Sequence, residues 1–194
     1  AANTVTFNKL ISSTHNLAAN PGFEVGDAVW VKDTGVTIEQ SATNARNGNW
    51  YAKIVGGVTE RALATEAYIE CSPGDVWRGA AWARSVSVPI SNANASIALH
   101  WYDKDKAYLS STVTSLAPTG TWTQLVATGT APASTQYVRF AERVTANAAP
   151  AGDWIWDDAE LTRASQIIVH GTPGAQRTVI DGDGVHGYNS GNVL

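Results

Sequence analysis

Hydrophobic and polar residues alternate with a period of two over most of the chain between residues 36 and 162. This period is typical of half-buried β-strands, because successive side chains of a strand point to opposite faces. The alternating segments are separated by turn-forming sequences, such as Ser-Pro-Gly-Asp at 72–75. Many short strands with such turns between them predict an all-β fold, an antiparallel β-sandwich or barrel. The predicted strands are residues 36–41, 50–55, 65–71, 76–86, 95–103, 107–114, 122–129, 135–143 and 153–162.

The two ends of the chain differ from this central part. Residues 1–15 form a polar lead-in that we interpret as a neck or linker, and residues 16–162 are interpreted as the sandwich. Residues 163–194 are rich in glycine and hold short alternating runs, which predict a Gly-rich β segment. With few large apolar residues, this segment cannot build a core alone. We therefore expect it to pack on further sequence or on copies of itself, and both ends read as cuts within a longer polypeptide.

The Asp-Gly-Asp-Gly run at 181–184 predicts a hairpin turn between two short strands of this last segment. It also resembles half of a calcium loop. The further oxygen ligands and the distal Glu that such a loop needs are missing from the sequence. The hairpin is therefore favoured over a metal site.

Composition and charge narrow the classes of partner. The formal net charge is −4, the pI is about 5.5 and no basic run is present, which argues against nucleic acid or anionic lipid as the main partner. No apolar run approaches the roughly 20 residues of a membrane span, so membrane insertion is not expected. Cys71 is the only cysteine, which excludes an intrachain disulfide, and we interpret it as a small buried hydrophobe.

Three segments in order along the chain resemble the jelly-roll superfamily of carbohydrate-binding modules found beside cellulases and xylanases. Residues 16–26 (NLAANPGFEVG) are similar to the "N-x-x-F-E-x-G" opening of those modules. The turn at 72–75 is followed by Trp77 and the strand sequence Ala-Trp-Ala-Arg at 81–84. Residues 154–161 (WIWDDAEL) are similar to the closing "aromatic-I-D-D-V-x-L" strand. The resemblance implies a jelly roll and a non-catalytic role in carbohydrate binding.

The flanks resemble a different class of protein. Residues 178–189 (TVIDGDGVHGYN) are similar to the "I-D-x-x-G-V-x-x-Y-N" segments of tail proteins from phages of Gram-positive hosts, and residues 4–11 are similar to their inter-domain necks. This second resemblance implies a virion tail protein, commonly a homotrimer, that contacts other tail proteins and recognises a host cell-surface polysaccharide. The alternatives are a purely structural virion sandwich that binds only protein, and the binding module of a secreted glycosidase.

The two parities of the predicted strands carry different chemistry. One parity is apolar and is expected to face the core: Ile97, Leu99 and Trp101, then Val138 and Phe140, then Ile155, Ala159 and Leu161. The other parity collects aromatic rings, whose faces can stack on the apolar face of a pyranose, and side chains that hydrogen-bond hydroxyls. Packing or a protein interface is the alternative role for these residues. The candidate carbohydrate-binding residues are Trp82, Arg84, His100, Tyr102, Tyr137, Arg139, Trp154 and Trp156.

Asp157 shares the parity of the apolar residues Ile155 and Ala159. An inward carboxylate is costly unless it has a cation or several N–H donors. In the modules that the chain resembles, a structural calcium lies between the opening loop and the last strand. The resemblance therefore implies a Ca²⁺ site at Glu24 and Asp157, since calcium prefers oxygen ligands. The alternative is that Asp157 accepts backbone hydrogen bonds and that Glu24 is solvated.

The sequence does not indicate an enzyme. The nucleophile elbow Gly-x-Ser-x-Gly is absent, the four histidines lack zinc-ligand spacing, and no glycine loop for phosphate opens a helix. Asp153, Asp158 and Glu160 are close together in the sequence, but nothing selects a general acid from among them.

Overall fold

The computed structural model describes residues 15–86, 93–146 and 152–164, and the backbone of 167–170, 177–181 and 184–188. Asn16–Thr162 form one compact unit, and Ala1–His15 with Arg163–Leu194 form a second. The described residues contain strands and turns but no helix, so none of them belongs to a helix that could cross a membrane.

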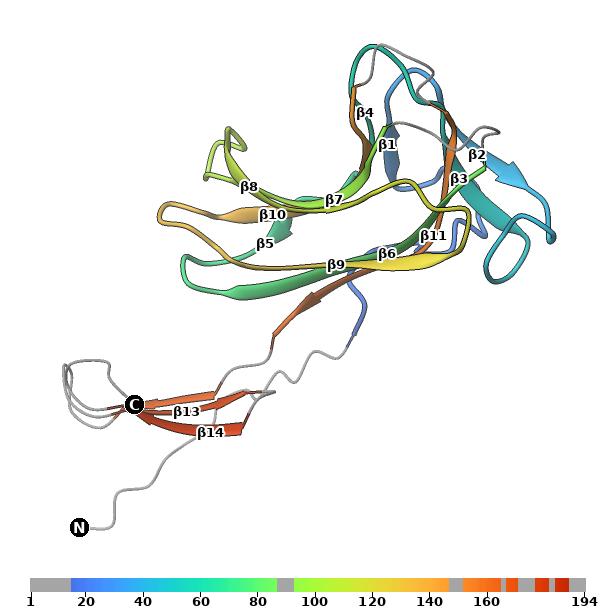
Figure 1. Ribbon diagram of the computed structural model, residues 1–194. Coiled ribbons are helices and arrows are strands. Elements are labelled where there is room, and N and C mark those ends of the chain that lie inside the picture. Colours follow the sequence, from blue (N-terminus) through green and yellow to red (C-terminus); the bar gives the residue numbers. More distant parts are fainter. Residues whose placement is uncertain are drawn as a thin grey trace, which may run out of the picture. The chain divides into compact units, whose positions relative to one another are not determined.

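Two antiparallel sheets build the first unit (Figure 1). Sheet A has the order β1 (Trp30–Lys32), β4 (Arg61–Thr65), β10 (Tyr137–Val144), β7 (Ala95–Tyr102) and β8 (Tyr108–Leu116), and β5 (Ile69–Glu70) also pairs with β10. Sheet B has the order β2 (Val36–Gln40), β3 (Trp50–Ile54), β11 (Trp154–Arg163), β6 (Val76–Ser85) and β9 (Thr123–Thr130). The predicted all-β antiparallel sandwich is confirmed.

Most predicted strands agree with the structure to within one to two residues. The exception is the predicted strand 65–71, which is wrong: the chain forms β4 at 61–65, bends, and forms the short β5 at 69–70. β1 at 30–32 was not predicted. Both β1 and β4 are held by sheet pairing, with β4 between β1 and β10. Because Ala62 and Ala64 are small apolar residues, the alternation of β4 is weak in the sequence.

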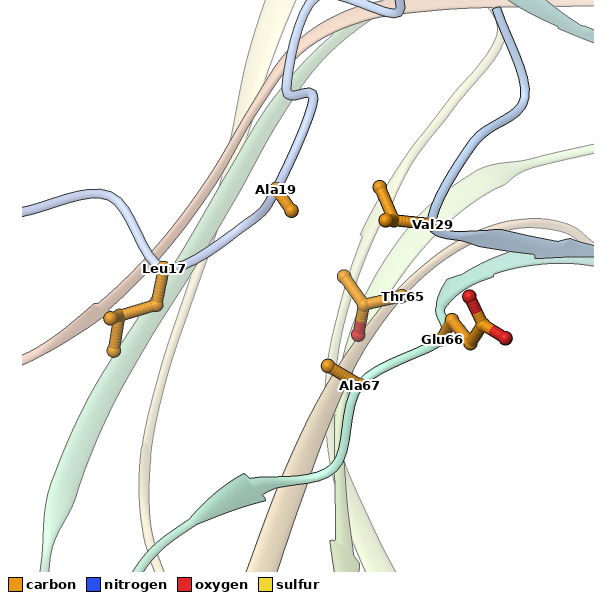
Figure 2. Close-up of a pocket in the computed structure, with 6 residues that line it drawn as sticks. All are labelled: Leu17, Ala19, Val29, Thr65, Glu66 and Ala67. Carbon is orange, nitrogen blue, oxygen red and sulfur yellow. The ribbon is translucent and has the colours of Figure 1, made fainter.

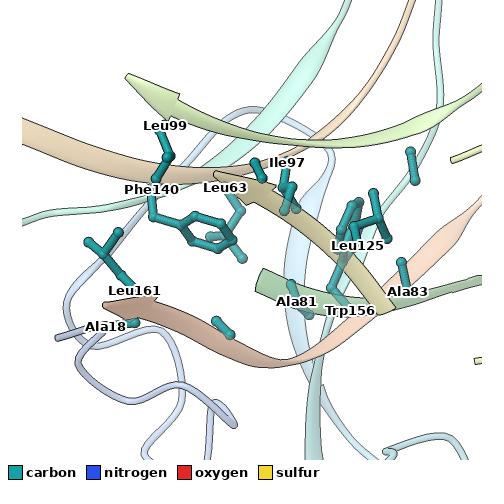
Figure 3. Packing of buried hydrophobic residues seen from close by; sticks show 14 of the residues in the cluster. Ala18, Leu63, Ala81, Ala83, Ile97, Leu99, Leu125, Phe140, Trp156 and Leu161 are labelled. Atoms are coloured by element: carbon teal, nitrogen blue, oxygen red, sulfur yellow. The ribbon is translucent and has the colours of Figure 1, made fainter. Parts of the chain in front are cut away.

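The core lies between the sheets and is filled from strands of both (Figure 3). The inward positions predicted in β7 and β10 are confirmed: Ile97, Leu99 and Trp101, with Val138 and Phe140. Gly79 in β6 permits this packing, because a Cβ at that position would lie only 2.7 Å from the Phe140 ring. Alternation within a strand is therefore enough to predict the inward side of these two strands.

The last strand, β11, does not keep one alternation along its length. Trp154 and Trp156 belong to the core cluster and are fully buried, and Ala159 and Leu161 belong to it as well. Two core residues of even number followed by two of odd number require one extra residue between them. Asp158 is that residue, with a positive φ of 52° that is typical of a β-bulge or local kink. The prediction that Trp154 and Trp156 lie on an outer face is wrong for this reason.

The second unit contains a three-stranded antiparallel sheet of β12 (Ile167–His170), β13 (Arg177–Asp181) and β14 (Gly184–Tyr188). β13 and β14 pair with Asp181 opposite Gly184, as a hairpin at 181–184 requires. The predicted neck at 1–15 lies outside the described residues, apart from its last one.

Sheet A is curved, and its face away from sheet B is concave (Figure 1). Small side chains line the middle of this face: Ala98 of β7 and Ala141 of β10 pair in register, are fully buried and do not belong to the core cluster. Larger side chains flank them along both strands. The concave face therefore has a floor of small residues between longer polar and aromatic ones.

Candidate functional site

The eight residues predicted to form one binding face occupy three different places. His100, Tyr102, Tyr137 and Arg139 lie on β7 and β10, on the concave face of sheet A. Trp82 and Arg84 lie on β6, on the outer side of the other sheet, because β6 directs the alternate residues Trp77, Ala81 and Ala83 into the core. Trp154 and Trp156 are in the core itself. A single face made of all eight residues is therefore excluded.

Sheet pairing brings the first four residues together. Tyr137 stands opposite Tyr102, and Arg139 stands opposite His100, in the antiparallel pair of β10 and β7. Directly opposite side chains on one face of such a pair are in contact range. Both pairs lie next to the hairpin that joins β7 to β8. The site is therefore built on two neighbouring inner strands, and their register determines its geometry.

Five rings form a continuous group on this face, which we call the aromatic cluster: Tyr68, His100, Tyr102, Tyr108 and Tyr137. Their contacts are edge-to-face, with ring centroids from 4.9 Å (Tyr68–Tyr102) to 6.4 Å (His100–Tyr102) apart. Such geometry is the favoured one for aromatic pairs. Tyr108 at the edge is 57% exposed, whereas Tyr102 at the centre is 9% exposed. The cluster is thus anchored within the sheet and open to solvent at Tyr108.

The charge state of His100 follows from its position. Burial, together with the positive charges of Arg143 and Arg139, lowers the pKa of His100 to about 4. The imidazole is therefore neutral at pH 7, with one nitrogen that donates a hydrogen bond and one that accepts. Burial also raises the pKa of the Tyr102 hydroxyl, against the effect of Arg139. The face offers uncharged donors and acceptors beside its rings, a combination that suits hydroxyl groups.

Three members of the site were missed by the sequence reasoning: Tyr68, Tyr108 and Lys106. Lys106 lies in the β7–β8 hairpin with its Nζ 4.8 Å from the Tyr68 ring centroid and 5.8 Å from that of Tyr137. Tyr108 stands opposite Tyr102 across the same hairpin, so the polar turn between two tyrosines could have indicated it. Tyr68 precedes β5 and no sequence signal identifies it, because its place depends on the pairing of β5 with β10.

On the outer side of sheet B, the predicted residues are engaged by their neighbours. The Arg46 guanidinium lies 3.8 Å from the Trp82 ring centroid and forms an ion pair with Asp158. Arg84 lies 5.4 Å from the Trp122 ring centroid. Trp82 thus helps to hold the loop that carries Arg46, and one of its faces is covered by that contact. This arrangement favours a structural role for Trp82.

The two predicted calcium ligands lie at one corner of the molecule. A Cβ on Gly22 would be 3.7 Å from Asp157 Oδ1 and 3.8 Å from Glu24 Cγ, so Gly22 separates them. Asp157 is fully buried, and its carboxylate accepts N–H bonds from Arg46 (2.8 Å), Asn47 (3.0 Å) and Asp158 (2.7 Å). Burial raises the pKa of Asp157 to about 6, and these bonds oppose the rise.

The Glu24 carboxylate also accepts hydrogen bonds from backbone N–H groups. Its Oε1 accepts N–H bonds from Asn49 at 2.9 Å and from Trp50 at 3.2 Å. The described residues contain no group of three or more His, Cys, Asp or Glu that could hold a metal ion. Two carboxylates suit calcium, but its six to eight oxygen ligands would then have to include backbone carbonyls or water. The structure thus shows both carboxylates bound to backbone N–H groups, and the calcium stays a prediction.

The structure also contains a pocket of about 240 Å³ (Figure 2). It is lined by Leu17, Ala19, Val29, Thr65, Glu66 and Ala67. Thr65 is committed to β10, since its hydroxyl bonds the Phe140 carbonyl at 3.4 Å. With a mostly apolar lining, this pocket lacks the fixed donors and acceptors that would orient a polar ligand.

Glu142 differs from Asp157 and Glu24, because its carboxylate accepts no hydrogen bond among the described residues. It is fully buried on the core side of β10, and neither of its oxygens has a hydrogen-bond partner among the described residues. Burial raises its pKa well above the usual value, and the charge of Asp157 adds to the rise.

Comparison with known protein structures identifies the type of β-sandwich. No protein-family model and no curated protein matches the sequence. A family 61 carbohydrate-binding module solved with β-1,4-galactotriose matches 77% of this chain and 99% of its own chain, with a TM-score of 0.57 and 20% identity. The chain has the jelly-roll fold of carbohydrate-binding modules. A family 16 carbohydrate-binding module agrees, with 75% of this chain and 99% of its own chain covered, a TM-score of 0.58 and 19% identity.

A third similar structure belongs to a bacteriophage tailspike protein. The enzymatically active domain of tailspike protein 4 of bacteriophage CBA120 matches 76% of this chain with a TM-score of 0.59 and 12% identity. The match spans only 21% of that chain, so the similarity is confined to one part of the tailspike chain. At these identities the likeness is one of fold.

Proposed function

We propose that this domain binds a carbohydrate, without catalysis, on the concave face of sheet A. The observation that supports this most is the aromatic cluster, in which five rings and the hydrogen-bonding side chains beside them share one solvent-facing surface of a rigid sheet. Aromatic faces stack on sugar C–H groups, while hydroxyls and a neutral imidazole exchange hydrogen bonds with sugar hydroxyls. A binding role without catalysis also agrees with the modules that resemble the domain over nearly their whole length.

We further propose that the domain belongs to a larger protein that attaches to a polysaccharide. The favoured candidate for this larger protein is a phage tail protein. The likeness to part of a bacteriophage tailspike and the tail-like sequences of the flanks support this context. The setting would be an extracellular virion tail, with other tail proteins as neighbours and a host cell-surface polysaccharide as ligand. A secreted glycosidase is the second candidate context, because a xylanase with a family 22 module matches 80% of this chain, over 30% of its own chain.

The experiment is a calorimetric titration of the domain with a panel of neutral and anionic soluble glycans, including β-1,4-galactan, xylan oligosaccharides and polygalacturonate. Thermal melts of each protein accompany the titrations. Tyr108→Ala removes the exposed ring of the cluster. Trp122→Ala is the matched control, because it removes a ring that lies beside Arg84 of sheet B, just before β9. Loss of one stacked ring should weaken binding about tenfold for Tyr108→Ala, with an unchanged melting temperature. Trp122→Ala should bind as the parent does.

Two results would contradict the proposal. If Trp122→Ala loses affinity and Tyr108→Ala does not, the binding surface is on sheet B. If no glycan binds the parent domain, the aromatic cluster serves packing or a protein interface, and the structural alternative holds.

A further inference from the structure

Two cations lie on the aromatic cluster, and neither is in an ion pair among the described residues. Lys106 Nζ lies over Tyr68 and Tyr137, and the Arg139 guanidinium carbon lies 4.9 Å from the Tyr68 ring centroid. Cation–π contacts of this kind hold a charge in place and leave its outer side able to meet an anion. Tyr68 is thus contacted by a positive charge from the hairpin and another from β10.

Arg139 is the more firmly positioned of the two. Its Nε donates a hydrogen bond of 2.6 Å to the Thr65 carbonyl, and its Nη2 is buried with no acceptor among the described residues. A guanidinium held in this way keeps its charge, since arginine does not lose its proton in proteins. A negative charge nearby would offset the cost of this partly desolvated group.

Among the described residues, no other charged side chain of this face forms an ion pair with either of these two cations. Arg143 is already paired with Glu60, with an Nε–Oε1 distance of 3.0 Å, so that pair is neutral. His100 is uncharged at pH 7. Asp103 in the hairpin accepts the N–H groups of residues 105 and 107, and Glu70 stands opposite Tyr137 without an ion pair to Lys106 or Arg139.

The whole chain carries a net charge of −4, which would repel an acidic ligand in general. A local group of cations on a concave face can reverse the sign of the potential there. We propose that the carbohydrate bound on the aromatic cluster carries a negatively charged substituent, a carboxylate or a phosphate ester, and that Lys106 and Arg139 select for it. This inference rests on the carbohydrate-binding role proposed above.

The hairpin itself supplies a matched pair of variants. Lys106→Gln removes the charge above the rings, and Lys104→Gln removes an exposed charge in the same hairpin that is paired with Asp105 and lies over no ring. The parent and both variants would be titrated with three polymers: polygalacturonate, a glycerol-phosphate polymer and a neutral β-1,4-galactan. Each titration would be done at about 0.05 M and about 0.5 M salt.

We expect the parent to bind one of the two anionic polymers more tightly than the neutral galactan, with the preference lost at the higher salt. The polymer that binds identifies the substituent as carboxylate or phosphate. Lys106→Gln should weaken anionic binding about fivefold and leave galactan binding unchanged, while Lys104→Gln should act as the parent. Galactan binding that equals or exceeds anionic binding, or equal effects of the two variants, would overturn the inference and leave the proposed function intact. If none of the three polymers binds, both fail.

Discussion

Glu142 offers the sharpest test of the physical reasoning, because the structure places its carboxyl where neither protonation state is well supported. The side chain is fully buried in the core, and its two oxygens have no hydrogen-bond partner among the described residues. The substitution Glu142→Met keeps the length of the side chain and removes both oxygens. We expect this variant to be more stable than the parent at neutral pH.

The magnitude follows from the cost of unpaired polar groups. A buried donor or acceptor without a partner costs about 1–3 kcal/mol, and a charged one more. Imperfect packing of the methionine side chain offsets this gain by up to about 1 kcal/mol. The free energy of unfolding should therefore rise by about 2 kcal/mol, which for a domain of this size corresponds to a melting temperature about 4–8 °C higher.

The gain should depend on pH in a defined direction. Because the pKa of Glu142 is raised in the folded state above its usual 4.5, the folded protein binds this proton more tightly than the unfolded chain does. Stability from this group is fully present below 4.5 and is lost as the pH rises through the folded-state pKa. Methionine has no such loss, so the advantage of the variant should grow with pH. His100 titrates in both proteins without an interaction with Glu142, so its contribution cancels in the difference.

The assay is urea and thermal unfolding of parent and variant at pH 5 and pH 8, with Glu66→Met as the control at an exposed carboxylate. The control should change stability by less than about 0.5 kcal/mol. A Glu142→Met variant that is less stable than the parent at pH 8 would refute the reasoning. That result would mean that the carboxylate is held as an anion by a partner, such as a cation or a buried water.

Three further predictions concern the core, the metal and the tail. Trp156→Ala should lower the free energy of unfolding by about 3–5 kcal/mol, measured by chemical denaturation, and a folded variant that has lost only glycan binding would show that the ring faces outward after all. If calcium binds at Glu24 and Asp157, its addition should raise the melting temperature by several degrees and a chelator should reverse this, because an ion that binds only the folded state stabilises it; identical melts would argue for the hydrogen-bonded corner alone. Residues 163–194 should pack by self-association, as a trimer in light scattering, or be removed by protease from a monomer; a protease-resistant monomeric tail would contradict this.

The amino-acid sequence alone determined the fold class and most strand positions, because alternation and turn chemistry are local properties that survive in any tertiary context. The inward residues of β7 and β10, such as Leu99 and Phe140, could be read from parity because these strands run without interruption through the sheet. The same inference from parity was wrong for Trp154 and Trp156 of β11. Parity there changes at Asp158, whose positive φ is enforced by the surrounding structure and leaves no signal in the alternation.

The candidate site was decided mainly by tertiary structure. Two sheets give a sandwich two outer faces, and no periodicity assigns a strand to one sheet or the other, so Trp82 and His100 could not be separated from sequence. Tyr68 reaches the cluster only because β5 pairs with β10, and Lys106 only because the hairpin returns over the rings. The burial of Asp157 was predicted, but the loop whose N–H groups satisfy it lies more than 100 residues earlier in the chain. Contacts between segments so distant are set by the closure of the two sheets, which the local pattern of residues does not encode.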